Sequence, residues 1–280
     1  MKLLTCIVFH YKAERLSYLR QVLHNHQYLA PTVHSIVTTN TNDPSELAGI
    51  ASVAPSTSGH YRFDIESFSQ LPNPWLLPWA HKGVFAVRMK DSSYTHFMFS
   101  EDDIEVSPVN VEYWLRTREW LRPFGLYPSF FRVEWSEKAS QWMSTDIANP
   151  VSIAGSFILR SVNGNYHYLN MPNPYQAMFF YDRELMEEHA ASDTFDILKY
   201  GHIERIDNTP GGGGVAERAN LALTFEKVPA GFISRNVVSY FEKYRLLDPH
   251  CFVHHLPNNY ANLRNDLKFG KLPVKDVLCV

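Results

Sequence analysis

Three consecutive carboxylates, Glu101, Asp102 and Asp103, are the residues with the clearest potential for chemistry. They follow residues 94–99, a short apolar and aromatic segment that is typical of a buried strand. Adjacent carboxylates repel one another, and no Lys or Arg follows them before Arg116. A divalent cation would neutralise them, and oxygen ligands suit Mg²⁺ or Mn²⁺. The run therefore predicts a metal site at the end of a strand.

The alternative interpretation is a solvated acidic turn that leads into a helix. That helix already has its own start signal, with Ser107 as N-cap and Pro108 at the first helical position. The acids are not needed as caps, which favours the metal site. An arginine already bound to Asp103, or an Asp103 turned away from any cavity, would overturn the metal site and any activity inferred from it.

A strand, a helix and a second strand are expected at the start of the chain, over residues 3–9, 14–26 and 32–39. This is a βαβ unit, so the two strands should be parallel with a right-handed crossover. Residues 10–14, the first turn, contain no glycine. That argues against a dinucleotide-binding fingerprint, whose glycines admit the pyrophosphate.

Ligands of open α/β sheets bind beyond the carboxyl ends of the strands. His10 and Tyr11 follow the first expected strand, and Asn40 follows the second. Tyr11 could stack on a base while Asn40 hydrogen-bonds the edge of that base. Ordinary loop polarity is the alternative for both residues. Together with the acids, they would suit a nucleotide diphosphate and its metal.

The region around the acids resembles a known family. Residues 94–113, with the core Phe-Ser-Glu-Asp-Asp-Ile-Glu-Val-Ser-Pro, resemble the metal-binding region of GT-A-fold glycosyltransferases. The Glu-Asp-Asp form is similar to the Asp-x-Asp variant of the N-acetylglucosaminyltransferase family that starts N-glycan branching. The similarity covers roughly the first 120 residues. It implies that Asp103 holds the metal, that Glu101 and Asp102 lie at the ribose and diphosphate, and that uridine diphosphate carries the sugar.

Lys82 lies on an expected helix over residues 79–90. It could add a phosphate contact, and the alternative is a solvated charge on the helix surface.

Glu217 is the candidate catalytic base. It follows the glycine-rich segment 209–214 and lies near the start of an expected helix, where the macrodipole favours a carboxylate. The string Gly-Val-Ala-Glu resembles the glycine-plus-acid element of the GT-A fold, in which an acid deprotonates the acceptor hydroxyl. Arg218 stands where a second acid often follows, and it could pair with Glu217 instead. A plain N-terminal helix acid is the alternative, and the glycines could form a lid.

His254 and His255 precede a Pro-Asn-Asn turn. Several GT-A enzymes use a C-terminal His as a metal ligand, so by resemblance His255 could complete a metal site with Asp103. A core or loop histidine is the alternative for either residue.

The composition is that of an ordinary globular protein, with 45% hydrophobic and 20% charged residues. A net charge of −3 does not indicate the excess of basic residues that is typical of proteins that bind nucleic acid. Cys6, Cys251 and Cys279 have no metal-ligand spacing and are expected to be reduced thiols. No apolar stretch approaches the roughly 20 residues that span a bilayer. We therefore expect a cytoplasmic protein without a membrane span.

The expected fold is one GT-A-like α/β domain, with a Rossmann-type mixed sheet flanked by helices. Residues 1–125 would bind nucleotide and metal, and residues 126–280 would bind the acceptor. The expected activity is a metal-dependent glycosyltransferase that moves a sugar from a nucleotide-diphosphate donor to a hydroxyl of a carbohydrate or glycoconjugate. The expected course is inversion with Glu217 as base, and retention is the alternative if no acid reaches the acceptor. The alternatives are a sugar nucleotidyltransferase and a non-catalytic carbohydrate-binding protein of the same fold.

Overall fold

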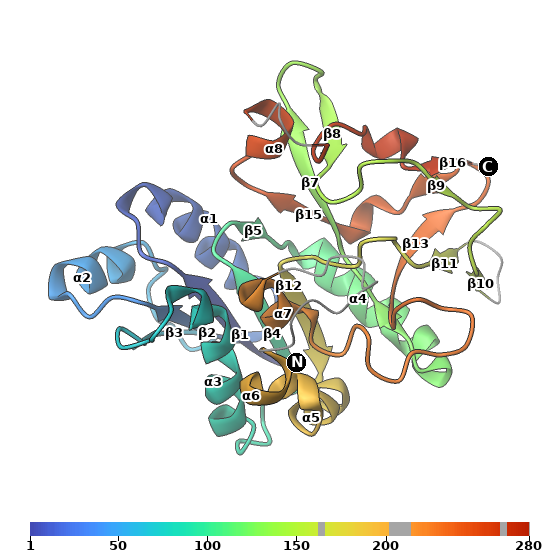
Figure 1. The fold of residues 1–280 in the computed structure, drawn as a ribbon. Helices are drawn as coiled ribbons and strands as arrows, with labels where there is room; N and C mark the ends of the chain where they lie inside the picture. Colours follow the sequence, from blue (N-terminus) through green and yellow to red (C-terminus); the bar gives the residue numbers. More distant parts are fainter. Residues whose placement is uncertain (162–165, 202–213, 264–267, 280) are drawn as a thin grey trace. The chain divides into compact units, whose positions relative to one another are not determined.

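The fold is mixed α/β, with mixed sheets flanked by helices (Figure 1). The structure is a computed structural model that describes residues 1–161, 166–201, 214–263 and 268–279. No helix in these ranges is both long and apolar enough to cross a membrane. Cys6, Cys251 and Cys279 are all free thiols, as expected.

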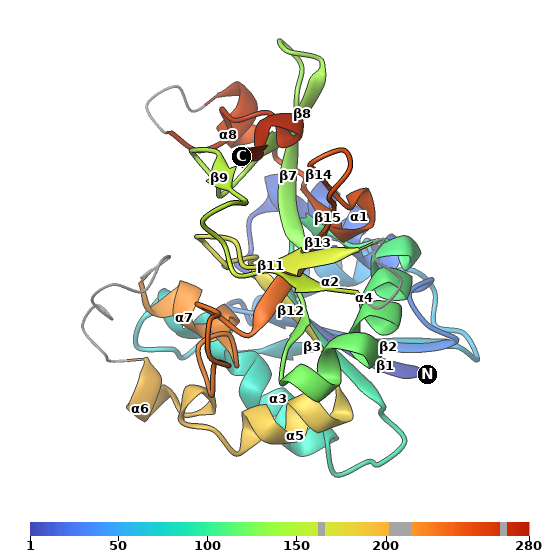
Figure 2. The same ribbon diagram turned by 90° about the vertical axis from the view of Figure 1, so that its right-hand side faces the viewer.

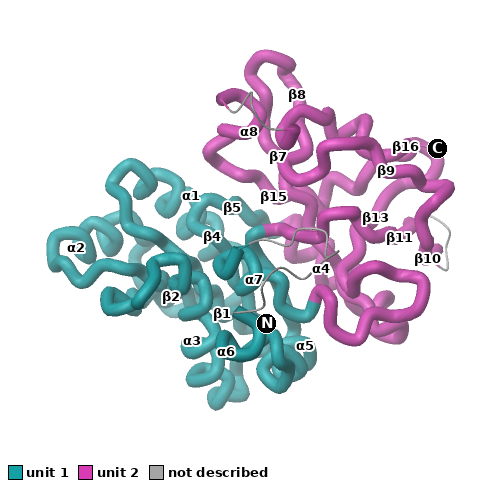
Figure 3. Tube along the Cα trace, viewed as in Figure 1, with its two compact units in different colours: residues 1–108, 177–223 teal, residues 109–176, 224–280 magenta. Residues whose placement is uncertain are grey.

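The chain divides into two compact units (Figure 3). Unit 1 contains residues 1–108 and 177–223, and unit 2 contains residues 109–176 and 224–280. The expected halves, 1–125 and 126–280, differ from this division because residues 177–223 join the N-terminal unit. This placement matters for function, since it puts Glu217 in the same unit as Asp103.

The strands of unit 1 form a mixed sheet in the order β12-β4-β1-β2-β3 (Figure 1). Their bounds are β1 Lys2–Phe9, β2 Thr32–Thr39, β3 Tyr61–Ser67, β4 His96–Glu101 and β12 Met178–Asp182. Strands β1 to β4 are parallel, and β12 runs antiparallel to β4. The parallel βαβ unit predicted at the start of the chain is therefore confirmed. Strand β4 begins two residues later than the apolar pattern indicated.

Helices cover both faces of this sheet. Helix α1 (Leu16–His26) lies on one face, and α3 (Ala80–Arg88) and α5 (Arg183–Ala190) lie on the other (Figures 1 and 2). Helix α1 is amphipathic, and its buried apolar side chains at positions 19, 22 and 23 recur at helical spacing. Strand β1 is central and buried from its second residue onward, as expected for a strand with helices on both sides.

The remaining elements of unit 1 are short. They are α2 Pro44–Ser52, α6 Ile197–Tyr200, α7 Val215–Leu221, β5 Ile104–Glu105 and the 3₁₀ helices η1 Ala13–Arg15, η2 Pro74–Trp79 and η4 Asp193–Phe195. Asp43 caps α2, and its carboxylate accepts the backbone N–H groups of Ser45 and Glu46.

Unit 2 is built mainly from short strands. Strands β10, β11, β13 and β14 pair in that order, β6 pairs with β13, β15 pairs with β7 and β7 with β8, and β9 pairs with β16. The bounds are β6 Tyr127–Pro128, β7 Phe131–Ser136, β8 Gln141–Ser144, β9 Val151–Ser152, β10 Leu159–Arg160, β11 His167–Leu169, β13 Asn236–Phe241, β14 Leu246–Leu247, β15 Phe252–His255 and β16 Leu278–Cys279. Its helices are α4 Pro108–Leu121, which begins at the last residue of unit 1, and α8 Asn259–Asn262, with the 3₁₀ helices η3 Arg122–Phe124, η5 Pro249–Cys251 and η6 Val274–Asp276.

Candidate functional site

The carboxyl ends of β1 and β2 are joined by a side chain. The backbone N–H of Tyr11 donates to Asn40 Oδ1 at 2.8 Å. The two strands are parallel and in register up to Phe9 and Thr39, which brings the residues after them together. Asn40 therefore uses its carbonyl oxygen to hold the two strand ends. Its amide nitrogen makes no hydrogen bond with the residues that the structure describes and could contact a ligand.

The side chains of His10 and Tyr11 lie against neighbouring residues of unit 1. The His10 ring is 6.2 Å from that of Trp75, centroid to centroid, and the Tyr11 ring meets Phe9 edge-on at 5.9 Å. A Cβ built on Gly49 of α2 would lie 3.7 Å from the Tyr11 hydroxyl. Burial lowers the pKa of His10, with help from the charges of Arg15 and Lys12. His10 is therefore a neutral side chain at pH 7.

An arginine binds the acidic cluster at the end of β4. Asp102 and Asp103 are each only 4% exposed, and both contact Arg15 of η1. Arg15 Nε donates to Asp102 Oδ2 at 2.8 Å and Nη2 donates to Asp102 Oδ1 at 2.7 Å. Nη2 also donates to Asp103 Oδ2 at 2.8 Å. These contacts use Nε and Nη2, and Nη1 makes no hydrogen bond with any residue that the structure describes.

Arg15 removes the premise of the charge argument for a metal. No basic residue follows the acids closely in the sequence, whereas the cation comes from the first βα turn, 87 positions before Asp102. No local pattern connects Arg15 with these acids. The only available signal was that residues after parallel neighbouring strands meet at one sheet edge.

Burial and charge act in opposite directions on Asp102. Burial raises the pKa of Asp102 to about 7, while the hydrogen bonds from Arg15 act to lower it and the charge of Asp103 raises it further. The pKa of Arg15 is raised by both carboxylates, despite the opposing effect of burial. Arg15 therefore stays charged, and Asp102 gains a proton near neutral pH.

Glu101, the last residue of β4, has a partner that the sequence analysis missed. Asn220 Nδ2 donates to Glu101 Oε1 at 3.1 Å, and Asn220 is only 5% exposed. Asn220 lies on α7, whose first residue is held by a hydrogen bond of 2.7 Å from Trp79 Nε1 to Val215 O. Helix α7 therefore contributes a side chain at the carboxyl end of β4.

Glu217 lies in the first turn of α7 and is half-buried. A Cβ built on Gly214 would lie 3.1 Å from Glu217 Oε2, so the carboxylate folds back toward the start of its own helix. Arg218 Nε bonds Gly214 O at 3.5 Å. The geometry is that of the helix-terminal acid named as the alternative, and the role of Glu217 as a base stays a prediction. The expected lid in segment 209–214 lies outside the described residues except for Gly214.

Lys82 differs from the solvated helix charge that was one of its two sequence interpretations, and its contact with a phosphate stays a prediction. It is 4% exposed rather than solvated, and its ammonium donates to the carbonyl oxygen of Thr194. The same ammonium lies 3.7 Å from the centre of the Trp79 ring. Burial lowers the pKa of Lys82 well below its usual value. The expected solvated surface charge is wrong, because α5 and η4 cover this face of α3.

The two histidines proposed for metal binding belong to unit 2. His255 is 6% exposed and its Nδ1 bonds Glu134 Oε1. Glu134 Oε2 also accepts the backbone N–H of Ala261 at 2.6 Å. His254 Nε2 bonds Asn258 Oδ1 at 2.9 Å. Asp103 belongs to unit 1, so its pairing with His255 stays a prediction.

The described residues do not form a metal centre of their own. No group of three His, Cys, Asp or Glu side chains suited to a metal occurs among them. Asp102 is held by Arg15 through both carboxylate oxygens, and one oxygen of Asp103 accepts from the same guanidinium. The donor set at the end of β4 is thus one arginine-bound acid pair. Arg15 thus occupies carboxylate oxygens that a metal ion would use, and the expectation of Mn²⁺ or Mg²⁺ stays a prediction.

Comparison with known proteins adds no assignment. No family model matches the chain, and a search of curated proteins found no match.

Proposed function

We propose that unit 1 binds a nucleotide-diphosphate sugar and that the protein transfers the sugar to a hydroxyl of a carbohydrate or glycoconjugate. The observation that carries this proposal is the gathering of Arg15, Asn40 and Glu101 at the carboxyl ends of adjacent parallel strands, the edge where open α/β sheets bind nucleotides. A GT-A-like arrangement of this sheet is part of the proposal.

Arg15 is the proposed contact for the diphosphate. Its Nε and Nη2 are held by Asp102 and Asp103, which leaves Nη1 and its two N–H groups to donate to a phosphate oxygen. Its side chain is 29% exposed, whereas its carboxylate partners are buried. The acids then orient a cation, and this differs from the sequence interpretation, in which they bind one.

The chemical benefit of Arg15 follows from the leaving group. Negative charge develops on the diphosphate as its bond to the sugar breaks, and a fixed cation stabilises that charge more in the transition state than in the ground state. The amide of Asn40 and the carboxylate of Glu101, fixed by Asn220, would contact the base and the ribose. Glu217 is the proposed base for the acceptor hydroxyl, and direct displacement would invert the anomeric centre.

Calorimetric titration with UDP and UDP-glucose tests donor binding. We expect Arg15→Gln to weaken binding of UDP-glucose by about tenfold or more, because a charge-assisted bond to phosphate is lost. Arg20→Gln, an exposed arginine on α1, is the matched control and should bind as the wild type does. If no nucleotide diphosphate binds to the wild type with or without Mn²⁺, the proposal is wrong.

The same titration tests the metal. If binding survives EDTA and depends on Arg15, the cation at the diphosphate is Arg15. If EDTA or Asp103→Asn abolishes binding while Arg15→Gln does not, the metal-dependent form predicted from the sequence is correct. UDP is the first nucleotide to test, since the family resemblance implies it.

A non-catalytic nucleotide-sugar-binding protein is the second candidate, and the Arg15–Asp103 bond favours it. A carboxylate held by an arginine is less available to a metal that activates the donor. Slow release of free sugar from UDP-glucose, lost in Arg15→Gln with folding intact, would exclude this candidate. A nucleotidyltransferase would instead release pyrophosphate from a nucleoside triphosphate and a sugar phosphate.

A further inference from the structure

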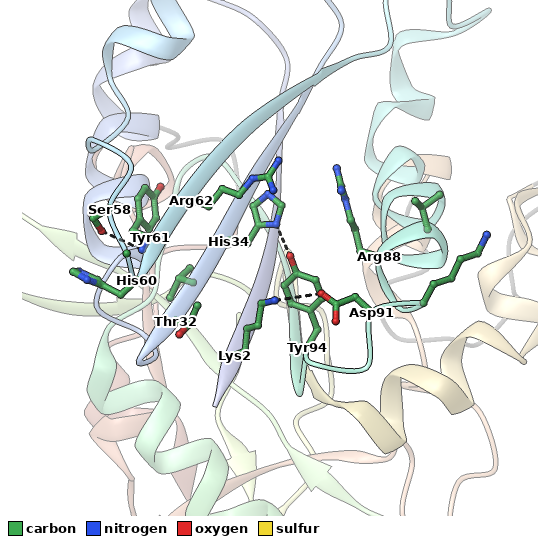
Figure 4. A pocket seen from close by; sticks show the side chains of 14 residues that line it. Lys2, Thr32, His34, Ser58, His60, Tyr61, Arg62, Arg88, Asp91 and Tyr94 are labelled. Carbon is green, nitrogen blue, oxygen red and sulfur yellow. Dashed lines mark hydrogen bonds and ion pairs between the residues drawn. The ribbon is translucent and has the colours of Figure 1, made fainter.

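Unit 1 has a cavity at the amino ends of its parallel strands, on the side of the sheet opposite the carboxyl ends described above. It measures about 560 Å³ and lies at the amino ends of β1, β2 and β3, beside the end of α3 and the turn before β4 (Figure 4). A cavity of this size suits a small molecule. It is remote in the fold from the carboxyl edge, because parallel strands place their two ends on opposite sides of the sheet.

The lining of this cavity is basic. Four of its described residues are Lys or Arg, against one carboxylate, in a chain whose net charge is −3. The carboxylate, Asp91, already pairs with Lys2 at 3.3 Å. The other basic residues are Arg62 of β3, Arg88 of α3 and Lys90, which follows α3. Cations thus come from separate elements around one space.

Both arginines keep donors for a ligand. Arg62 Nη2 lies 2.8 Å from Asp64 Oδ2, and Arg88 Nη2 donates to Glu66 Oε1 at 3.3 Å. Each guanidinium has five N–H donors, so one carboxylate contact leaves most of them available. Lys90 is exposed and forms no ion pair within the described ranges. Figure 4 shows Arg62 and Arg88 on two sides of His34.

His34 and Tyr94 are buried residues that also line this cavity. His34 is 2% exposed, with Nδ1 2.6 Å from the Tyr94 hydroxyl and Nε2 2.8 Å from Asp64 Oδ2. Burial lowers the pKa of His34 against the opposing effect of Asp64. A neutral ring then donates a hydrogen bond from Nε2 to Asp64 and accepts a hydrogen bond from the Tyr94 hydroxyl at Nδ1. The lone pairs of the Tyr94 oxygen remain to accept a hydrogen bond from a ligand.

We propose that this cavity binds the phosphate monoester of a small hydroxylated molecule, with the phosphate between Arg62 and Arg88. A phosphate has three free oxygens that accept from two guanidinium groups at once, whereas one guanidinium can satisfy a carboxylate. Lys90 adds charge at the rim. The Tyr94 oxygen accepts from a hydroxyl, and Val33 and Val87 line the cavity beside the carbon skeleton.

Calorimetric titration with ribose 5-phosphate, inorganic phosphate and citrate tests the proposal on the whole chain. We expect ribose 5-phosphate to bind, inorganic phosphate to bind more weakly, and citrate to fail. Arg62→Gln and Arg88→Gln should each weaken ribose 5-phosphate binding by about tenfold. Arg20→Gln, outside the cavity, should leave it unchanged. Tyr94→Phe keeps the ring and should weaken ribose 5-phosphate more than inorganic phosphate.

Arg15→Gln separates this site from the proposed donor site. Ribose 5-phosphate binding that persists in Arg15→Gln and falls in Arg88→Gln supports the second site, whatever the fate of UDP-glucose binding. Binding lost in Arg15→Gln but kept in Arg88→Gln overturns it. Equal binding of citrate and ribose 5-phosphate, or no binding of either, also overturns it.

Discussion

Arg15 and Asp102 form a two-bond pair, with Nε 2.8 Å from Oδ2 and Nη2 2.7 Å from Oδ1. The pair connects the first βα turn to the residue that follows β4. A planar guanidinium matches a carboxylate in this geometry, which fixes both groups more firmly than a single bond would. The stability of this sheet edge and its proposed affinity for phosphate therefore depend on the same side chain.

Arg15→Gln should destabilise the protein by about 1–3 kcal/mol, because it leaves two buried carboxylates without their cation. Arg15→Lys keeps the charge but loses the paired geometry, so its stability should lie between those of Arg15→Gln and the wild type. Urea unfolding at pH 7.5 measures the difference. Arg20→Gln should lie within about 0.5 kcal/mol of the wild type, as expected for an exposed site. Equal stability of Arg15→Gln and Arg20→Gln would show that the pair contributes nothing.

Binding of UDP-glucose should strengthen as the pH falls from 8 to 6. Burial raises the pKa of Asp102 to about 7, so Asp102 loses its negative charge in this range and holds Arg15 less strongly. The diphosphate of UDP-glucose keeps its charge over the same range, so the protein is the source of the effect. Calorimetry at several pH values should give a sloped profile for the wild type and a flat one for Asp102→Asn. A similar slope in both would exclude Asp102 as the titrating group.

The raised pKa of Asp102 also has a consequence for stability. A folded-state pKa above the unfolded value means that the folded chain binds the proton more tightly. The favourable contribution is complete below the unfolded pKa of about 4 and is lost as the pH rises through about 7. The stability of Asp102→Asn relative to the wild type should therefore increase between pH 5 and pH 8.

Asn220→Ala should weaken UDP-glucose binding about three- to tenfold, because Glu101 loses a hydrogen bond that orients it. Asn25→Ala is the matched control. This substitution removes a hydrogen bond of 2.6 Å from the side-chain amide of Asn25 to a different carboxylate, Glu105 Oε1. Calorimetry should show wild-type affinity for Asn25→Ala. If both variants lose affinity equally, Glu101 has no special role in binding.

Lys82→Met tests the buried ammonium. The pKa of Lys82 is lowered by burial, so the folded chain releases this proton at a lower pH than the unfolded chain does. Wild-type stability should rise with pH toward the usual lysine pKa of about 10.4, and the Met variant should lack this rise. Urea unfolding from pH 7 to pH 10 should show the free energy of unfolding of the wild type increasing relative to that of Lys82→Met. A constant difference across this range would mean that Lys82 keeps an ordinary pKa.

Local patterns in the sequence were sufficient for much of the unit 1 sheet. The predicted strand over residues 32–39 matches β2, and the predicted strand over residues 3–9 lies within β1. Both segments are rich in apolar or β-branched residues and are almost entirely buried. Residues 151–160 are less regular, because the two ends of this segment form β9 and β10, which pair with different partners. Weak alternation in that segment did not determine a register.

The charge partners within the site could not be predicted in the same way. Arg15 and Asp102 are far apart in the chain, and each alone looks like a surface side chain. Lys82 looked like a solvated helix residue because its cover, η4, comes more than a hundred positions later. Such contacts depend on how elements pack, and single-sequence periodicity carries no information about that packing.

The order of synthesis has a consequence for strand β12. Until residues 109–176 have left the ribosome, β4 has no neighbour on its outer side, and the nascent sheet exposes an unpaired row of N–H and C=O groups. In a fragment that ends after β4, these backbone groups of β4 would stay unpaired. Expression of residues 1–108 alone should therefore favour aggregation. A genetic fusion of residues 1–108 to 177–223 would restore β12 as the neighbour of β4.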